Sequence, residues 1–154
     1  MTKPRGFTLI ELVITMVVVA ILASIAVPAY NSYILKSHRT EAKTALLDLA
    51  SMEERFFSTQ NVYSQLPTDL GYTGAAFPVT VGSYYQINIE PTLWALATAP
   101  GAGNTAGTPA TFGFTATPIN MQVNDTACKT LTISSTGTKT ATGNDPNPSV
   151  DCWN

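Results

Sequence analysis

The chain has 154 residues, and its 8 basic and 10 acidic side chains give a formal net charge of −2. Outside an apolar N-terminal stretch, about 120 residues remain, which is enough for one compact domain and too few for two. The sequence contains no polybasic tract, so its charge gives no support for nucleic-acid binding.

The N-terminal stretch from Phe7 to Val27 is apolar, with Glu11 as its one charged residue. As a helix this stretch is about 30 Å long, which matches the hydrocarbon core of a bilayer. Lys3 and Arg5 precede it, and this positive flank predicts that the N-terminus stays in the cytoplasm. We therefore expect a segment that spans a membrane or is buried in an assembly.

The bond between Gly6 and Phe7 is the expected cleavage position, because the basic leader meets the apolar helix there. A secretory signal, by contrast, is cut after its apolar region. Glu11 is unusual, because a carboxylate at membrane depth is costly and requires a partner. Cleavage after Gly6 would create that partner, a free α-ammonium on Phe7 one helical turn away or on a neighbouring subunit.

Residues 6–12 (GFTLIEL) resemble the prepilin signal of type IV pilins and the related pseudopilins. The resemblance implies that a membrane-embedded prepilin peptidase cuts after Gly6 and methylates the new N-terminus of Phe7. It also implies that Glu11 helps to dock each subunit into a growing filament. The implied partners are other pilin subunits and the inner-membrane assembly machinery. The alternative is a plain membrane anchor in which Glu11 is merely tolerated.

The helical pattern resumes after Pro28. Proline in a helix removes the hydrogen bond to the carbonyl four residues back, here that of Ser24, so we expect a kink or local unwinding. Between residues 30 and 57 the apolar positions 42, 45, 49, 52 and 56 are spaced by three or four residues, which marks one face of a helix. We interpret the adjacent acids Glu53 and Glu54 as a solvated edge of this helix.

Residues 60–82 contain several prolines and glycines and are expected to form an irregular connection. Alternating apolar residues then predict four strands. They are Tyr84–Ile89, Leu93–Ala99, Phe112–Thr117 and Leu131–Ser134, of which the first two are close enough to form a hairpin. We expect an α+β fold: a four-stranded antiparallel sheet, within residues 84–134, packed on the C-terminal half of a long N-terminal helix.

The two cysteines, Cys128 and Cys152, lie near the C-terminus, and the Thr- and Gly-rich tail between them is expected to be a loop. With the N-terminus inside, the C-terminal domain lies outside the cytoplasm, where disulfides persist. We predict a disulfide that closes loop 128–152, worth about 3.5 kcal/mol in the chain-entropy model. The alternative is two buried free thiols.

The C-terminal part adds a second resemblance. Residues 115–118 (TATP), Cys128, residues 131–133 (LTI), Gly137 and residues 152–153 (CW) resemble the PilE-type minor pilins of gammaproteobacterial type IVa systems. Together the two resemblances cover most of the chain and are weak only in its variable loops.

The expected organisation follows from both resemblances. Residues 1–6 form a leader, 7–28 a transmembrane and polymerisation helix, and 29–154 a globular pilin domain. The implied location is the inner membrane for the precursor, which crosses it once, and the periplasm and cell-surface pilus for the assembled subunit.

The sequence offers no set of residues typical of an enzyme. His38 is the one histidine, and no phosphate-binding loop or nucleophile elbow is present. Oxygen ligands for calcium are available from Asn144, Asp145, Asn147 and Asp151, but turn chemistry explains these residues equally well. We therefore predict a protein that is not an enzyme and that has no cofactor or metal.

The function that we predict is a structural subunit of a type IV pilus, with the minor pilins as the favoured subgroup. Adhesion, twitching motility or DNA uptake would be functions of the whole fibre, and only the resemblance implies them. No specific nucleic-acid partner is predicted, because Lys129 and Lys139 alone do not form a basic stripe. The alternatives are a type II secretion pseudopilin and an anchored surface adhesin that does not polymerise.

Overall fold

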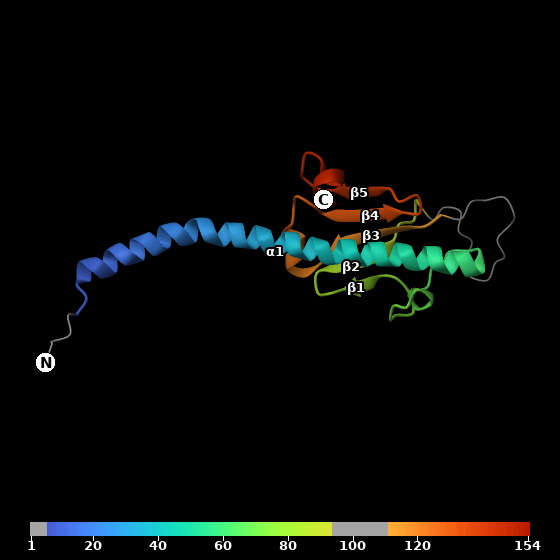
Figure 1. The fold of residues 1–154 in the computed structure, drawn as a ribbon, viewed down its shortest axis with the longest axis horizontal. Helices are drawn as coiled ribbons and strands as arrows, with labels where there is room; N and C mark the ends of the chain where they lie inside the picture. Colours follow the sequence, from blue (N-terminus) through green and yellow to red (C-terminus); the bar gives the residue numbers. More distant parts are fainter. Residues whose placement is uncertain (1–5, 94–110) are drawn as a thin grey trace. The chain divides into compact units, whose positions relative to one another are not determined.

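The computed structural model describes residues 6–93 and 111–154. Five strands form one antiparallel sheet in the order β1-β2-β3-β4-β5. This arrangement, a long helix with an antiparallel sheet, confirms the predicted α+β fold (Figure 1). The elements in chain order are α1 (Leu9–Gln60), the 3-10 helix η1 (Pro67–Leu70), β1 (Val79–Val81), β2 (Tyr85–Ile89), β3 (Gly113–Pro118), the 3-10 helix η2 (Asn120–Asn124), β4 (Thr130–Ser134), β5 (Lys139–Thr142) and α2 (Pro148–Asp151).

The chain divides into two units, one ending at Lys36 and one beginning at Ser37, and α1 contributes to both. In the first unit α1 is the one described helix, and all described side chains up to residue 33 are exposed. In the second unit the remaining turns of α1 lie across the sheet (Figure 1). The globular core is therefore built entirely within the second unit.

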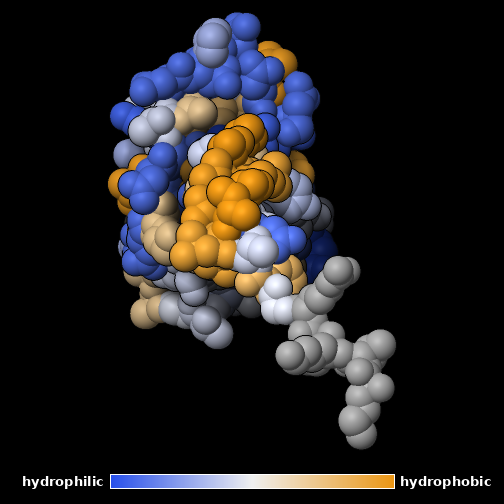
Figure 2. Space-filling model, turned by 90° about the vertical axis from the view of Figure 1, so that its left-hand side faces the viewer, coloured by the Kyte–Doolittle hydropathy of each residue, from blue (hydrophilic) through white to orange (hydrophobic). Residues whose placement is uncertain are grey.

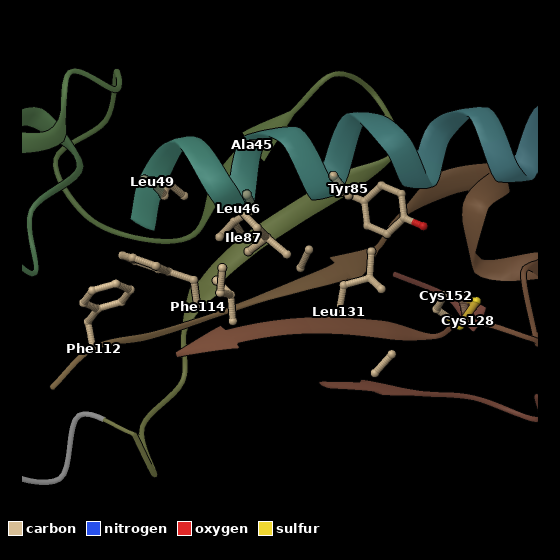
Figure 3. Packing of buried hydrophobic residues seen from close by; sticks show 14 of the residues in the cluster. Ala45, Leu46, Leu49, Tyr85, Ile87, Phe112, Phe114, Cys128, Leu131 and Cys152 are labelled. Carbon is tan, nitrogen blue, oxygen red and sulfur yellow. A yellow bond between two sulfur atoms is a disulfide. The ribbon is translucent and has the colours of Figure 1, made fainter. Parts of the chain in front are cut away.

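The core lies between one stripe of α1 and one face of the sheet. The stripe contributes Ala42, Ala45, Leu46 and Leu49, all buried, as the spacing of apolar residues predicts. Alternate residues of the strands point toward this stripe, because side chains in a strand alternate between the two faces of its sheet. Figure 3 shows these inward side chains, which include Tyr85, Ile87, Phe114 and Leu131.

The pairing register keeps the buried residues in line across the sheet. Phe114 of β3 lies opposite Ile133 of β4, and Leu131 of β4 lies opposite Ala141 of β5. A slip of one residue would turn each of these side chains to the other face of the sheet. The hydrophobic pattern therefore determines the register as well as the core.

Within the described residues the sheet has five strands, so the prediction of four is wrong. β1 lies in the stretch that we predicted to be an irregular connection, and β5 lies in the predicted C-terminal loop. Both strands are short, and β5 contributes only Ala141 to the core, which is why alternation of apolar residues did not reveal them. Each becomes a strand by pairing with a longer neighbour, β2 or β4.

The predicted strand Leu93–Ala99 falls mostly outside the described residues, which resume at residue 111. Among the described strands, β2 pairs with β1 on one side and with β3 on the other. The predicted hairpin with residues 93–99 lies outside the described residues.

α1 is unbroken at Pro28, so local unwinding at this position is not present. The hydroxyl of Ser32 donates to the carbonyl oxygen of Pro28 at 3.0 Å, one turn further along the helix. A kink at Pro28 stays a prediction.

The core position of Leu46 can be tested against its neighbour on α1. Leu46→Ala should lower the free energy of unfolding by about 2–5 kcal/mol, because it leaves a cavity between α1 and the sheet. Leu47, which is 43 % exposed, is the control, and Leu47→Ala should change stability by less than about 1 kcal/mol. Chemical denaturation of the full chain in detergent micelles measures both, and equal effects would contradict this packing.

Candidate functional site

The predicted processing site lies just before α1. Gly6 and Phe7 are exposed and precede the first helical residue, and the side chain of Phe7 is 89 % exposed. Apart from Phe7, no described residue places an atom within 4 Å of the position that a Cβ at Gly6 would occupy. Within the described residues, the bond between Gly6 and Phe7 is therefore open to solvent.

Thr8 and Glu11 form a capping box at the start of α1. The backbone N–H of Thr8 donates to Glu11 Oε2 at 2.9 Å, and the Thr8 hydroxyl donates to the same oxygen at 2.8 Å. In return the backbone N–H of Glu11 donates to Thr8 Oγ1 at 3.3 Å. Such a box satisfies two backbone donors that a helix start otherwise leaves without partners. Glu11 thus has a local structural role in addition to the predicted assembly role.

Thr8 is a site residue that sequence reasoning missed. The Thr-x-x-Glu spacing of Thr8 and Glu11, placed directly before an apolar run, is a recognisable signature of a helix start. We expected a charged partner for Glu11 and therefore missed the Thr-x-x-Glu pattern. The predicted ammonium of Phe7 would act beside Thr8, not in place of it.

The first unit presents an almost wholly apolar surface. Among the described residues, α1 is long and apolar enough to cross a membrane. Its large hydrophobic side chains from Leu9 to Val27 are each at least 45 % exposed. Figure 2, seen toward the N-terminal end of α1, shows hydrophobic residues gathered on this part of the surface. An apolar surface of this extent requires lipid or protein to cover it.

A polar network fixes the first turns of the second unit. Arg39 of α1 donates to both carboxylate oxygens of Asp125, at 2.6 and 2.7 Å, and the side chains of the pair are 11 % and 2 % exposed. Asp125 Oδ1 also accepts the backbone N–H of Cys128 at 3.3 Å. The ion pair therefore joins α1 to the loop that leads into the disulfide.

Gln122 is the buried centre of the same network. Its amide nitrogen donates to the Tyr85 hydroxyl and to Asp125 Oδ2, both at 3.0 Å. Its oxygen lies 3.0 Å from His38 Nδ1, so this ring nitrogen carries the hydrogen. The His38 ring also stacks on Tyr84, with the ring centres 3.4 Å apart. His38 is therefore a packing residue of the helix.

The pKa values of two groups in this network, Arg39 and Tyr85, are raised. The hydrogen bond to Asp125 raises the pKa of Arg39 above its usual range, so the guanidinium stays charged. Burial raises the pKa of Tyr85 to about 12, so its hydroxyl stays neutral and accepts from Gln122. Neither shift falls where a catalytic acid or base would operate.

The predicted disulfide is confirmed. Cys128 and Cys152 are bonded, with their Cα atoms 5.8 Å apart, and both are fully buried in the core. The bond ties the short helix α2 and the residues after it to the start of β4. Within the described residues, no group of three or more His, Cys, Asp or Glu side chains has metal-binding geometry.

Glu53 contradicts our interpretation of Glu53 and Glu54 as a solvated edge. Glu54 is exposed, but the side chain of Glu53 is 0 % exposed. The reason is its spacing, since Glu53 lies four residues after Leu49 and so falls on the buried stripe. The sequence contained this signal, because the same spacing predicted the rest of the stripe.

Comparisons with known proteins fit this architecture. Residues 28–132 match the family described as "Type IV minor pilin ComP, DNA uptake sequence receptor". Residues 1–27 match the "Prokaryotic N-terminal methylation motif". The chain belongs to the type IV minor pilin family. This family agrees with the type IV pilins that the sequence resembles.

Curated relatives are also type IV pilins. The chain is 41 % identical over 70 residues to the "Type IV major pilin protein PilA" of Myxococcus xanthus, covering 46 % of this chain and 32 % of that protein. It is 34 % identical over 110 residues to the "Type IV major fimbrial protein FimA" of Dichelobacter nodosus, and the match covers 71 % of this chain and 67 % of that protein. The matches span from about a third to half of the first curated relatives' length.

The chain is also similar to a solved type IV pilin from Shewanella oneidensis, with 21 % identity and a TM-score of 0.47. The similar region covers 78 % of this chain and 98 % of that pilin.

The Arg39–Asp125 pair gives a second prediction. Asp125→Ala should lower the free energy of unfolding by about 3–5 kcal/mol, because it leaves the charge of Arg39 buried without a counter-charge. Asp151→Ala removes the same charge from an exposed position and should change stability by less than about 1 kcal/mol. Thermal or chemical unfolding of the full chain in micelles compares the two, and a loss below 1 kcal/mol for Asp125→Ala would show that the pair is dispensable.

Proposed function

We propose that this chain is a minor pilin that is cut between Gly6 and Phe7, methylated at Phe7 and assembled through the first unit of α1. One observation carries the proposal: an exposed apolar helix, whose first turn is capped by Thr8 and Glu11, directly follows the exposed Gly6–Phe7 bond.

The first unit needs two successive environments. Before assembly its apolar side chains are covered by the inner membrane, with the basic leader on the cytoplasmic side. In the fibre they are covered by the same helices of other subunits, which are equally apolar. Transfer from lipid to a protein core then costs little hydrophobic free energy, so specific polar contacts decide which helices associate.

Glu11 is the polar group that can direct this association. A buried carboxylate without a counter-charge is destabilising by several kcal/mol. Cleavage after Gly6 would create an α-ammonium on Phe7, either in the same subunit or in a neighbouring one. The bonds from Thr8 hold the carboxylate at the helix start, where that ammonium would meet it. Cleavage and docking are thereby linked through one charge pair.

The intact mass of the chain in pili sheared from cells tests the processing. We expect a mass that lacks residues 1–6 and includes one added methyl group, with a gain of two hydrogens on reduction of the disulfide. The amount of this chain relative to the other subunits of the fibre distinguishes a minor from a major pilin. A full-length chain confined to the membrane would instead support the anchored adhesin.

Replacement of Glu11 tests the assembly. Glu11→Ala should lower the amount of the chain in sheared pili at least about tenfold, because the docking charge pair is lost. The control Glu54→Ala removes a carboxylate from an exposed position in the second unit and should be incorporated normally. Equal incorporation of Glu11→Ala and wild-type chain, with equal membrane levels, would exclude this role of Glu11.

We also propose that the fibre containing this subunit serves in DNA uptake. The family match over residues 28–132 supports this role, because its description includes a DNA uptake sequence receptor. The exposed cations Lys129 and Lys139 lie at opposite ends of the β4–β5 pair, since Lys129 precedes β4 and Lys139 lies opposite Ile133. Phosphate binding requires several cations that converge, so we assign DNA contact to the fibre as a whole and not to these two lysines.

Transformation frequency distinguishes DNA contact by the fibre as a whole from DNA contact by Lys129 and Lys139 of this subunit. Glu11→Ala should lower transformation as strongly as loss of the whole chain, because the subunit is absent from the fibre. The double variant Lys129→Ala/Lys139→Ala should stay within about twofold of wild type. A fall of more than about tenfold for the double variant, with normal incorporation, would assign DNA contact to this subunit's own surface.

A further inference from the structure

The carboxyl group of Glu53 is enclosed between the last turns of α1 and the segment that follows, residues 61–70. Its side chain is 0 % exposed. Oε2 accepts the backbone N–H of Ser64 at 3.0 Å, and Oε1 has no hydrogen-bond partner among the described residues. Buried polar atoms are almost always hydrogen-bonded, so a carboxyl group that uses one of its two oxygens is an exception that requires an explanation.

Ser64 connects this carboxyl group to the next helix, η1. Its backbone N–H is bound by Glu53, and its hydroxyl donates to Asp69 Oδ2 at 2.6 Å. The same hydroxyl accepts the backbone N–H of Leu66 at 3.0 Å. Ser64 therefore bonds to α1 through Glu53 and to η1 through Asp69, and η1 forms the second half of segment 61–70.

The groups that surround Glu53 do not compensate a negative charge. On α1 its neighbour is Glu54, and the following segment contributes Asp69 and Tyr63, whose hydroxyl donates to Glu54 Oε1 at 3.1 Å. From the sheet, Phe112 packs edge-on against Tyr63 and carries no titratable group. Ionisation of Glu53 would thus bury a charge beside two other carboxylates, with one N–H group to stabilise it.

We propose that Glu53 is a proton-controlled latch, which holds segment 61–70 on the end of α1 while its carboxyl group is protonated and loosens the segment when the proton is lost. The latch uses no ligand other than the proton. It would make the surface formed by this segment sensitive to the pH of the medium around the cell.

The titration of Glu53 agrees in direction with this geometry. Burial, with smaller contributions from Glu54 and Asp69, raises the pKa of Glu53 from 4.5 to about 8, and the N–H of Ser64 opposes the rise. When the segment is released, water reaches the carboxyl group and its pKa returns toward 4.5. The docked form therefore binds more protons than the released form between pH 4.5 and 8.

The sign of the pH dependence follows from this difference. Docking is strongest below about pH 4.5, where Glu53 is protonated in both forms. As the pH rises toward 8, docking weakens by up to about tenfold per pH unit, and above 8 it no longer changes. Release would uncover Tyr63 and Leu70, which pack against the core in the docked form.

Amide hydrogen exchange of the full chain in detergent micelles tests the latch. The protection of the Ser64 amide, corrected for the intrinsic pH dependence of exchange, should fall between pH 5 and 8 and level off above it. Glu53→Gln keeps an oxygen for the Ser64 N–H and has no charge to gain, so its protection should be independent of pH. Glu54→Gln, the matched control, should keep a pH dependence, shifted to lower pH because one neighbouring negative charge is removed.

Titration of the Glu53 carboxyl group, followed by the NMR chemical shift of its carboxyl carbon, supplies a readout that does not depend on any variant. A midpoint near 8, coincident with the change in Ser64 protection, is the expected result. A midpoint near 4.5, or wild-type protection that does not change between pH 5 and 8, would overturn the proposal. A pH dependence that persists in Glu53→Gln would also overturn it, because another group would then be responsible.

Discussion

The structure depends on one constraint: a single helix must satisfy two different environments along its length. α1 runs without a break over 52 residues, yet its first turns expose apolar side chains on all sides and its later turns bury a single stripe. The first part lacks a hydrophobic partner among the described residues of its own chain, so lipid or other subunits must provide one. The second part has its partner in the sheet. The need for a covering partner thus follows from how the apolar surface is distributed along one helix.

Polar contacts concentrate where α1 enters the globular unit. His38 and Arg39, the second and third residues of that unit, contact the loop between β3 and β4 through Gln122 and Asp125. This loop leads directly to Cys128, so the helix, the sheet and the disulfide are joined by one buried network.

Much of this architecture could be predicted because it rests on strong local patterns. The apolar run, the spacing of Ala42, Ala45 and Leu49, and the alternation in β2, β3 and β4 identified the helix and three strands. β1 and β5 were missed because pairing with neighbours, not their own composition, makes them strands. Glu53 was misplaced because we gave its charge more weight than its spacing. The network around Gln122 joins residues 84 positions apart, from His38 to Gln122, and no single-sequence pattern reports such a contact.

The capping box has a consequence for maturation. Thr8 and Glu11 both lie on the far side of the bond between Gly6 and Phe7, and α1 begins at Leu9. If the chain is cut at this bond, as proposed, both residues of the cap are retained, because the described contacts of the cap involve no residue before Phe7. The described start of α1 would then need no rearrangement at the new end of the chain.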